Sequence, residues 1–331
     1  MTTTPTGGSL VLRTPAKLNL GLRLMGLRED GYHLLESVFA PIELWDELEI
    51  ELLAGSQQIE LEVASAAGET LPAALGAVSA GRDNLAFRAA EAFCRALSIE
   101  ARIRIRLVKI IPAAAGLGGG SSDAAAVLNG LSTLVGEPVD AATLEGLARG
   151  LGADVPFFLD PRASYVTGIG EIIAPLDELP SCELVVANPG ISLATAEVYR
   201  ATDALGSALT EPRPGSTMRA FSRLCRGNGD PGDESAHSNP MGPRAHDLWG
   251  DLLVNDLEPA ARRLCPPVGR LLGAMREAGA IAASMTGSGA TVFGVFESSE
   301  VAREAADWLR GSLARAAGQS WIRVSRLIGE R

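Results

Sequence analysis

A glycine-rich segment between an alternating run and an alanine-rich run most constrains the fold of this chain. Before the segment, residues 101–111 alternate apolar and basic side chains, and this period of two predicts a strand with one buried face. After it, residues 122–134 are rich in Ala and Leu and predict a helix. The segment is therefore expected to turn from a strand into a helix N-terminus. It comprises Pro112, Ala113, Ala114, Ala115, Gly116, Leu117, Gly118, Gly119, Gly120, Ser121 and Ser122.

A turn of this kind is suited to binding phosphate. Glycines let the backbone approach a ligand, and the free N–H groups and dipole of a helix N-terminus favour negative charge. Ser121 and Ser122 add hydroxyls that could reach a phosphate oxygen or Mg²⁺. The segment is not a common P-loop, because no Lys-Ser or Lys-Thr follows the glycines, and Ser121 breaks the dinucleotide fingerprint. The alternative is a plain connector with Ser122 as the helix cap.

A second polar feature lies near the N-terminus. Leucines recur at every second position over residues 18–24 and predict a strand, which places Lys17 and Asn19 on one face. For a single lysine, a solvated face is the ordinary explanation. Because Asn is depleted in strands, the Lys-Asn pair also fits the wall of a polar pocket.

Two further motifs carry possible chemistry. Tyr32 and His33 follow a turn, and together they could stack on and hydrogen-bond a nucleobase, although ordinary packing is the alternative. Asp154 lies after Gly152 and before Pro156, where it could cap a helix. A carboxylate at a helix N-terminus also stays ionised, as a catalytic base must, so the two roles are compatible.

These motifs together resemble those of the GHMP kinases, the family of galactokinase, homoserine kinase, mevalonate kinase and phosphomevalonate kinase. The shared core of the family's phosphate loop is Pro-x-x-x-Gly-Leu-Gly-x-Ser-Ser. The triple glycine of residues 118–120 and the Asp-Gly-Tyr-His of residues 30–33 are similar to one branch, which phosphorylates a cytidyl diphosphate derivative of methylerythritol. Residues 152–158 and 285–293 match the same branch in the expected order.

The resemblance implies a two-lobed α+β fold. Residues 1–160 would form the nucleotide-binding lobe, similar to ribosomal protein S5 domain 2, and residues 161–331 the GHMP C-terminal, substrate-side lobe. The active site would lie in the cleft between them. ATP would be the phosphoryl donor, with Mg²⁺ held mainly by its phosphates, and a small-molecule cytidyl diphosphate would be the acceptor.

The resemblance also implies roles for single residues. Asp154 would be the base with Lys17 beside it, and residues 112–122 would bind the phosphates of ATP. Substrate contacts would come from Asn19, Tyr32, His33, Thr195 and Tyr199, with Tyr199 stacking on cytosine. Thr195 and Tyr199 fit the start of an amphipathic helix equally well. Gly287, Ser288 and Gly289 would form a supporting loop, although by themselves they predict only a hairpin turn.

Bulk composition excludes several classes of function. The net charge of −11 argues against a nucleic-acid partner, and no apolar run is long enough to span a membrane. Scattered cysteines argue against a metal cluster, and the N-terminus does not read as a signal peptide. A cytoplasmic enzyme with reduced thiols is expected, as a monomer or weak homodimer. The cysteines are Cys94, Cys182, Cys225 and Cys265.

Residues 206–250 depart from the rest of the chain. They are rich in Gly, Pro, Ser, Asp and Asn and predict a long mobile loop. The resemblance to the family is weakest here. No role is expected for His237 or His246, because solvated loop histidines are the default.

Two other functions stay open. A sister kinase for mevalonate-type or homoserine-type substrates would share the phosphate loop but should lack the triple glycine and the Asp-Gly-Tyr-His motif. A metabolite-sensing protein on the same fold would have lost the base or its lysine. This chain keeps both Asp154 and Lys17.

Overall fold

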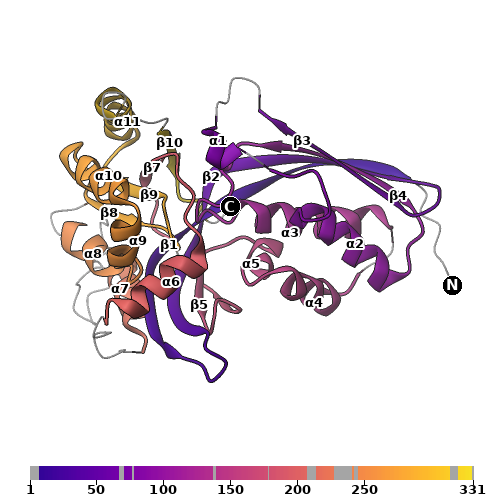
Figure 1. The fold of residues 1–331 in the computed structure, drawn as a ribbon, viewed down its shortest axis with the longest axis horizontal. Coiled ribbons are helices and arrows are strands. Elements are labelled where there is room, and N and C mark those ends of the chain that lie inside the picture. Colours follow the sequence, from indigo (N-terminus) through magenta and orange to yellow (C-terminus); the bar gives the residue numbers. More distant parts are fainter. Residues whose placement is uncertain are drawn as a thin grey trace.

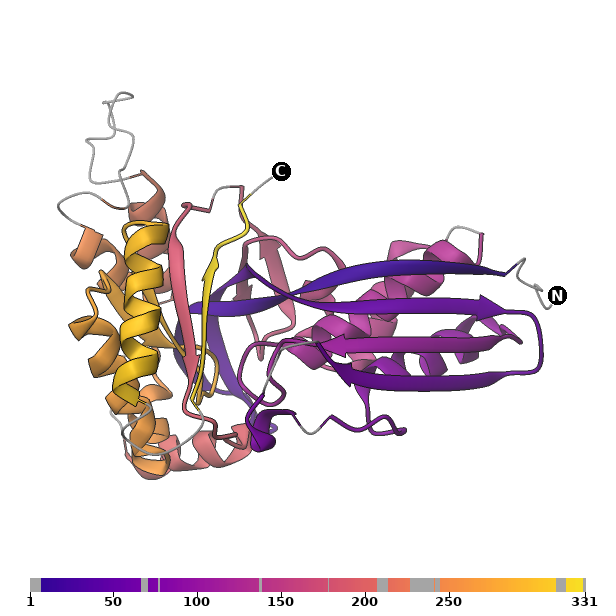
Figure 2. The same cartoon turned by 90° about the horizontal axis from the view of Figure 1, so that it is seen from above.

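The computed structural model shows a chain with two lobes side by side, each built on a sheet flanked by helices (Figures 1 and 2). Its elements are a mixture of α-helices and β-strands, as the sequence predicts. The structure describes residues 7–66, 71–76, 78–136, 139–177, 179–206, 214–226, 241, 245–313 and 320–329.

The first lobe contains a six-stranded sheet with the order β3-β4-β2-β5-β6, and β1 pairs with β2. The alternating run becomes β4, in which Ile103, Ile105 and Leu107 are fully buried while the arginines between them are partly or fully exposed. Helices α2 to α5 cover one face of this sheet (Figure 1). The strands are β1 (Gly8–Leu27), β2 (His33–Leu53), β3 (Gln58–Ser65), β4 (Arg102–Lys109), β5 (Ser164–Thr167) and β6 (Ile172–Pro175). The helices are α1 (Ala73–Gly76), α2 (Leu85–Leu97), α3 (Gly119–Leu134), α4 (Ala141–Leu151) and α5 (Val155–Leu159).

Helix α3 packs unusually close to the sheet. A Cβ added at Gly130 would lie 2.6 Å from Ile50 Cδ1 and 2.9 Å from Leu12 Cδ1. Glycine inside a helix costs about 1 kcal/mol relative to alanine. At Gly130 that cost permits close packing of the C-terminal half of α3 against β1 and β2.

The second lobe contains a four-stranded antiparallel sheet with the order β10-β7-β9-β8. The hairpin predicted around residues 287–289 is confirmed, because β8 and β9 pair as antiparallel neighbours on either side of that turn. The strands are β7 (Glu183–Asn188), β8 (Ala282–Met285), β9 (Val292–Phe296) and β10 (Trp321–Arg326). The helices are α6 (Thr195–Ala204), α7 (Ser216–Arg226), α8 (Ala245–Leu252), α9 (Glu258–Leu264), α10 (Pro266–Glu277) and α11 (Ser299–Leu313).

The long strands β1 and β2 reach into the second lobe. Leu22 of β1 bridges to Asn255, and Ile42 of β2 bridges to Leu327. Strands β5 and β6 pair within the first sheet although they lie beyond residue 160. The boundary at residue 160 stays a prediction.

The prediction of one long loop over residues 206–250 is wrong where the structure describes this segment. Helix α7 and most of α8 fall within it. Ala220, Phe221 and Leu224 of α7 are buried. Apolar residues recur there at helical spacing, although the composition of the surrounding segment is typical of a loop. The buried carboxylate of Glu36 accepts a hydrogen bond from the Gly215 N–H at 2.6 Å and another from Thr217 N–H, which fixes the start of α7. Residues 207–213, 227–240 and 242–244 lie outside the described residues.

None of the described helices combines the length and apolar character needed to cross a membrane. The four cysteines are free thiols.

Candidate active site

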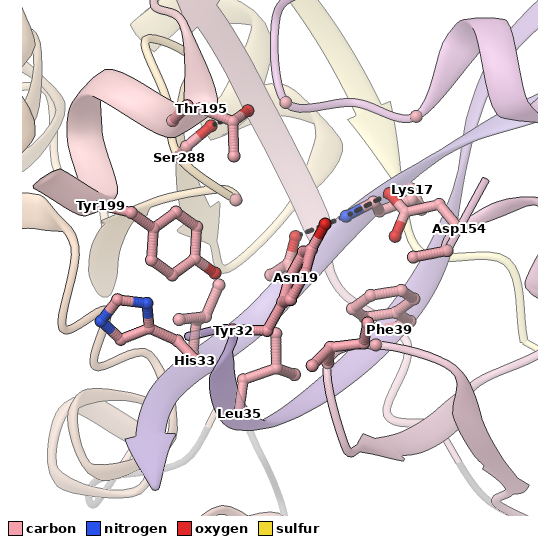
Figure 3. Close-up of a pocket in the computed structure, with 18 of the residues that line it drawn as sticks. Lys17, Asn19, Tyr32, His33, Leu35, Phe39, Asp154, Thr195, Tyr199 and Ser288 are labelled. Atoms are coloured by element: carbon pink, nitrogen blue, oxygen red, sulfur yellow. Dashed lines mark hydrogen bonds and ion pairs between the residues drawn. The ribbon is translucent and has the colours of Figure 1, made fainter. Parts of the chain in front are cut away.

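Residues from both lobes surround a cavity of about 650 Å³ (Figure 3). Its wall is formed by β1, the start of β2, the glycine-rich segment, the start of α5, helix α6 and the β8–β9 turn. The structure thus brings together most of the residues that the sequence singles out. Those that line the cavity are Lys17, Asn19, Tyr32, His33, Gly116, Gly118, Asp154, Thr195, Tyr199, Gly287 and Ser288.

Lys17 and Asp154 form an ion pair at one side of this cavity (Figure 3). Lys17 Nζ lies 3.4 Å from Asp154 Oδ2 and donates a 2.7 Å hydrogen bond to Asn19 Oδ1. The ammonium also lies 4.2 Å from the centre of the Phe39 ring. Lys17 is only 4% exposed, and a charge this buried is stable only with such partners. Lys17 and Asn19 are therefore pocket residues and not a solvated strand face.

Asp154 occupies the N-cap position of α5, as the sequence predicts, but its side chain makes no capping hydrogen bond. The carboxylate instead faces Lys17, and 33% of the side chain is exposed. Helix capping therefore does not explain the orientation of this carboxylate. It is open to a ligand in the cavity and is paired with a cation, which is the arrangement that a proton acceptor requires.

The glycine-rich segment is shaped by close contacts from both lobes. Gly116 and Gly118 have φ values of +78° and +73°, which glycine adopts without strain. A Cβ at Gly116 would lie 2.7 Å from the Thr286 carbonyl oxygen, and one at Gly118 would lie 2.7 Å from the Phe158 ring. Gly118 caps α3 without a side chain, so the first N–H groups of the helix point into the space above the loop.

We expect Gly116→Ala to destabilise the protein by about 3 kcal/mol, because it combines a strained φ with a backbone clash against the second lobe. Gly136→Ala is the matched control, since Gly136 has a φ of +74° but nothing within 4 Å of the added Cβ. It should cost only about 1 kcal/mol. Urea unfolding of both variants measures the difference. Equal losses would contradict the close contact between the loop and Thr286.

The Ser122 hydroxyl is not where a magnesium ligand would be. It is fully buried, donates to the Pro15 carbonyl oxygen at 2.6 Å and contacts the Thr14 hydroxyl. Helix α3 begins at Gly119, so Ser122 lies inside the first turn and does not cap it. The suggestion that Ser122 contacts Mg²⁺ is corrected on this ground. Its hydroxyl ties α3 to β1.

A buried charge cluster, made of Asp46, Lys109 and Asp123, lies beneath the loop and was missed in the sequence. Lys109 Nζ donates to Asp123 Oδ2 at 2.8 Å and also to Asp46. A Cβ at Gly119 would lie 3.2 Å from this ammonium, which places it under the first turn of α3. Burial raises the pKa of Asp123 to about 7, against the opposing effect of Lys109. The spacing of the three residues in the chain gave no signal of their meeting.

This raised pKa predicts a pH-dependent stability. Between about pH 4 and pH 7 the folded chain retains a proton on Asp123 that the unfolded chain releases, so the contribution of Asp123 to stability falls as pH rises. We expect the free energy of unfolding of the wild type, relative to Asp123→Asn, to decrease by roughly 3 kcal/mol across this window. Urea unfolding at a series of pH values measures it.

Asp140→Asn provides the control with opposite sign. Asp140 caps α4, and its hydrogen bonds with Thr143 lower the pKa of the carboxyl. The stability that it contributes is present above its ordinary pKa and is lost as pH falls.

The contrary outcome for Asp123 is a difference in the free energy of unfolding between the wild type and Asp123→Asn that stays constant with pH. That result would show that Asp123 is ionised throughout the range.

The end of the cavity away from the loop is aromatic. The His33 and Tyr199 rings have centres 4.9 Å apart and are tilted by 40°. Tyr32 is 59% exposed, with the Arg28 guanidinium 5.6 Å from its ring centre. Burial, followed by the negative charge of Asp154, raises the pKa of Tyr199 to about 12, so this hydroxyl stays neutral. Such a wall suits a planar, uncharged ring.

The β8–β9 turn closes the cavity from the second lobe. Asn255 Nδ2 donates to the carbonyl oxygens of Met285 at 2.8 Å and of Gly287 at 2.9 Å, which holds the turn in place. The hydroxyls of Ser288 and Thr195 lie 2.9 Å apart and connect the turn with α6. Gly289 packs against Met285 and does not line the cavity.

Phe39, Arg200 and Asp203 also line the cavity and are not among the residues predicted from the sequence. Phe39 is one apolar residue among many in a strand. Asp203 had a detectable signal, because it lies four residues after Tyr199 and thus on the same face of a helix.

Comparison with known proteins agrees with this fold. Residues 84–160 match the GHMP kinases N terminal domain, and residues 240–314 match the GHMP kinases C terminal. A crystal structure of Leishmania major mevalonate kinase with R-mevalonate superposes with a TM-score of 0.72, covering 100% of this chain and 99% of that one at 14% identity, which supports the fold alone. The two-lobed α+β fold expected from the sequence is therefore confirmed as the GHMP kinase fold.

Within this class, the chain is also similar to members of one group at higher sequence identity. The chain is 37% identical over 310 residues to the 4-diphosphocytidyl-2-C-methyl-D-erythritol kinase of Citrifermentans bemidjiense, covering 93% of this chain and 96% of the relative. It is 36% identical to the Geobacter metallireducens kinase of the same name, covering 92% and 95%. A crystal structure of 4-(cytidine 5'-diphospho)-2C-methyl-D-erythritol kinase superposes with a TM-score of 0.70 at 36% identity, covering 97% and 100%. The chain belongs to the 4-diphosphocytidyl-2-C-methyl-D-erythritol kinase family.

Proposed function

We propose that this protein transfers the γ-phosphoryl group of ATP to the 2-hydroxyl of 4-diphosphocytidyl-2-C-methyl-D-erythritol. The products are ADP and the 2-phosphate, an intermediate of the non-mevalonate, methylerythritol phosphate route to isoprenoid precursors. The observation that carries the proposal is the Lys17–Asp154 pair, which lies between the glycine-rich loop at one end of the cavity and the aromatic wall at the other.

The loop fits the phosphates of ATP. Its glycines leave no Cβ above the backbone, and α3 begins at Gly119 without a side-chain cap, so N–H groups and the helix dipole face the bound phosphates. Lys17, which lines the cavity beside the loop, adds a positive charge. Bound Mg²⁺ would neutralise part of the phosphate charge. Among the described residues, no group of three or more His, Cys, Asp or Glu side chains could hold a metal ion.

Asp154 accepts the proton of the substrate hydroxyl. As that oxygen bonds to the γ-phosphorus, the bond from phosphorus to the ADP oxygen breaks, and the proton moves to the Asp154 carboxylate. Lys17 is held by Asn19 and Phe39 where its charge can stabilise the transferring group. Phosphoryl transfer depends mainly on such positioning.

Tyr32, His33 and Tyr199 bind the cytosine ring in this proposal. His33 and Tyr199 already form a continuous aromatic wall, and Tyr32 is exposed at the mouth of the cavity, where a base can cover it. Thr195 lies on the same wall, and its hydroxyl can turn from Ser288 to the substrate. The expected state of monomer or weak homodimer stays a prediction.

Release of ADP from ATP and Mg²⁺ in the presence of four acceptors tests the function. We expect turnover with 4-diphosphocytidyl-2-C-methyl-D-erythritol and none with mevalonate, homoserine or galactose. Turnover with another alcohol would retain the phosphate loop but discard the cytosine site. Binding of ATP without any turnover would favour a metabolite-sensing protein.

A further inference from the structure

Ser37 of β2 lies behind the cavity wall, in contact with Asn19. Its side chain is fully buried and does not line the cavity. The Ser37 hydroxyl donates a 2.6 Å hydrogen bond to the Gly21 carbonyl oxygen. Asn19 Nδ2 donates a 3.1 Å hydrogen bond to the same hydroxyl. Ser37 is therefore one step removed from the residues that face a ligand.

The acceptor for Ser37 is held in place by an irregularity of strand β1. The register of β1 against β2 shifts between Asn19 and Leu22, which forms a β-bulge. Gly21 lies in this bulge with a φ of +82°, a conformation that favours glycine. A Cβ at Gly21 would lie 2.2 Å from the Leu252 carbonyl oxygen of the second lobe, so the backbone is closely packed there. The Gly21 carbonyl oxygen is thus a fixed acceptor for the Ser37 hydroxyl.

These contacts determine which end of the Asn19 amide faces Lys17. A serine hydroxyl has one proton, and Ser37 gives it to the Gly21 carbonyl oxygen, which can only accept. Toward Asn19 the hydroxyl is therefore an acceptor, so Nδ2 must point to Ser37 and Oδ1 away from it. Oδ1 then accepts the 2.7 Å hydrogen bond from Lys17 Nζ (Figure 3). A reversed amide would place two donors face to face at Lys17 and two acceptors face to face at Ser37.

We propose that Ser37 is a positioning residue for phosphoryl transfer, which orients the Asn19 amide and thereby holds the Lys17 ammonium in place. The inference rests on the proposed function for the role of Lys17 in the reaction. Lys17 is buried, and its hydrogen bond to Asn19 is shorter than its 3.4 Å contact with Asp154. Loss of the amide orientation should therefore release the ammonium from its place beside the reacting groups.

The ammonium can be observed directly in the ligand-free protein. Lys17 and Lys109 are the only lysines of the chain, so ¹⁵N-lysine labelling gives two side-chain signals, and Lys17→Met assigns them. Both side chains are buried, and Lys109 lies in the separate cluster with Asp46 and Asp123. In Ser37→Ala we expect exchange of the Lys17 ammonium protons with water to become about 10-fold faster, while Lys109 stays unchanged. The Lys109 signal also shows whether the variant is folded.

Kinetics test whether the effect reaches the reaction. Ser37→Ala should lower kcat about 10-fold while the KM for ATP changes less than about two-fold. Ser164→Ala is the matched control and should leave kcat within about two-fold of the wild type. Ser164 is a buried serine on the neighbouring strand β5, donates a 2.9 Å hydrogen bond to the Arg162 carbonyl oxygen and does not line the cavity.

A second variant covers the case in which Ser37→Ala does not fold. Ser37→Cys leaves no cavity but offers Asn19 only a weak acceptor. It should give a smaller loss of kcat and a smaller increase in ammonium exchange, both in the same direction. Wild-type values for the folded variant in both measurements would overturn the inference.

A double-mutant cycle with Asn19 separates positioning from a general structural role. If Ser37 acts through Asn19, Ser37→Ala should have no further effect on kcat once Asn19→Ala has removed the amide. A further 10-fold loss in the double variant would overturn the inference, because independent effects multiply. A protein in which Ser37→Ala changes the Lys17 signal, but which phosphorylates no cytidyl substrate, would contradict the proposed function. That result would still support the orientation of Lys17 by Ser37.

Discussion

Asp154→Asn should lower kcat about 1,000-fold while the KM for ATP changes less than about two-fold. The amide keeps the shape of the side chain but cannot accept the hydroxyl proton, and it weakens the contact with Lys17, 3.4 Å away. In the proposed mechanism, the phosphates of ATP are bound by the loop before α3, which Asp154 does not form. Steady-state ADP release measures kcat, and calorimetric titration with an ATP analogue measures nucleotide binding.

Asp160→Asn is the matched control for this prediction. Asp160 ends the same short helix and is exposed, where it pairs with Arg162 away from the cavity lining. Removing its charge should leave turnover within about two-fold of the wild type. Near-normal turnover in Asp154→Asn would remove Asp154 as the base. The carboxylate would then serve mainly to orient the hydroxyl, since a loose transition state needs little proton removal.

Lys17→Met should lower kcat by about 100-fold to 1,000-fold. Methionine fills a similar volume against Phe39, but it removes the charge that, in the proposed mechanism, stabilises the transferring phosphoryl group. The variant also leaves Asn19 Oδ1 without its donor at 2.7 Å and Asp154 without its cation. Thermal unfolding run in parallel shows whether the variant folds, so a loss of turnover in a folded protein can be assigned to the missing charge.

Arg13→Met is the control for Lys17. Arg13 lies on the same strand, β1, but is exposed, with its guanidinium over Trp45, and it does not line the cavity. Its replacement should leave kcat unchanged. If Lys17→Met kept wild-type kcat, the positive charge needed for transfer would have to come from elsewhere, and Arg200 on the cavity wall would be tested next.

Local patterns were enough to predict several elements. The alternation in residues 101–111 predicted β4, the glycine-rich segment predicted the strand-to-helix turn, and the leucine alternation placed Lys17 and Asn19 on one face. These inferences hold because side-chain period and glycine conformation depend on neighbours in the chain. The same reasoning failed for α7, where loop-like composition masked a short apolar face that the second lobe buries.

Roles that depend on distant partners could not be read locally. Ser122 has the hydroxyl and position of a phosphate or magnesium ligand, yet its contact with Pro15, 107 residues away in the chain, turns it inward. The cluster of Asp46, Lys109 and Asp123 is another case, because nothing in the order of the chain shows that a strand, a second strand and a helix place these charges together.

The sequence by itself determined the class of kinase, the glycine-rich turn before α3 and the shared face of Lys17 and Asn19, because each depends on short local motifs. Only the tertiary structure decided that Asp154 faces Lys17 instead of capping α5, and that His33 is held by Tyr199 and Asp203 from the other lobe. The physical reason is that these contacts form when two lobes close around one cavity. Their energy depends on burial and distance in space, which the order of residues does not contain.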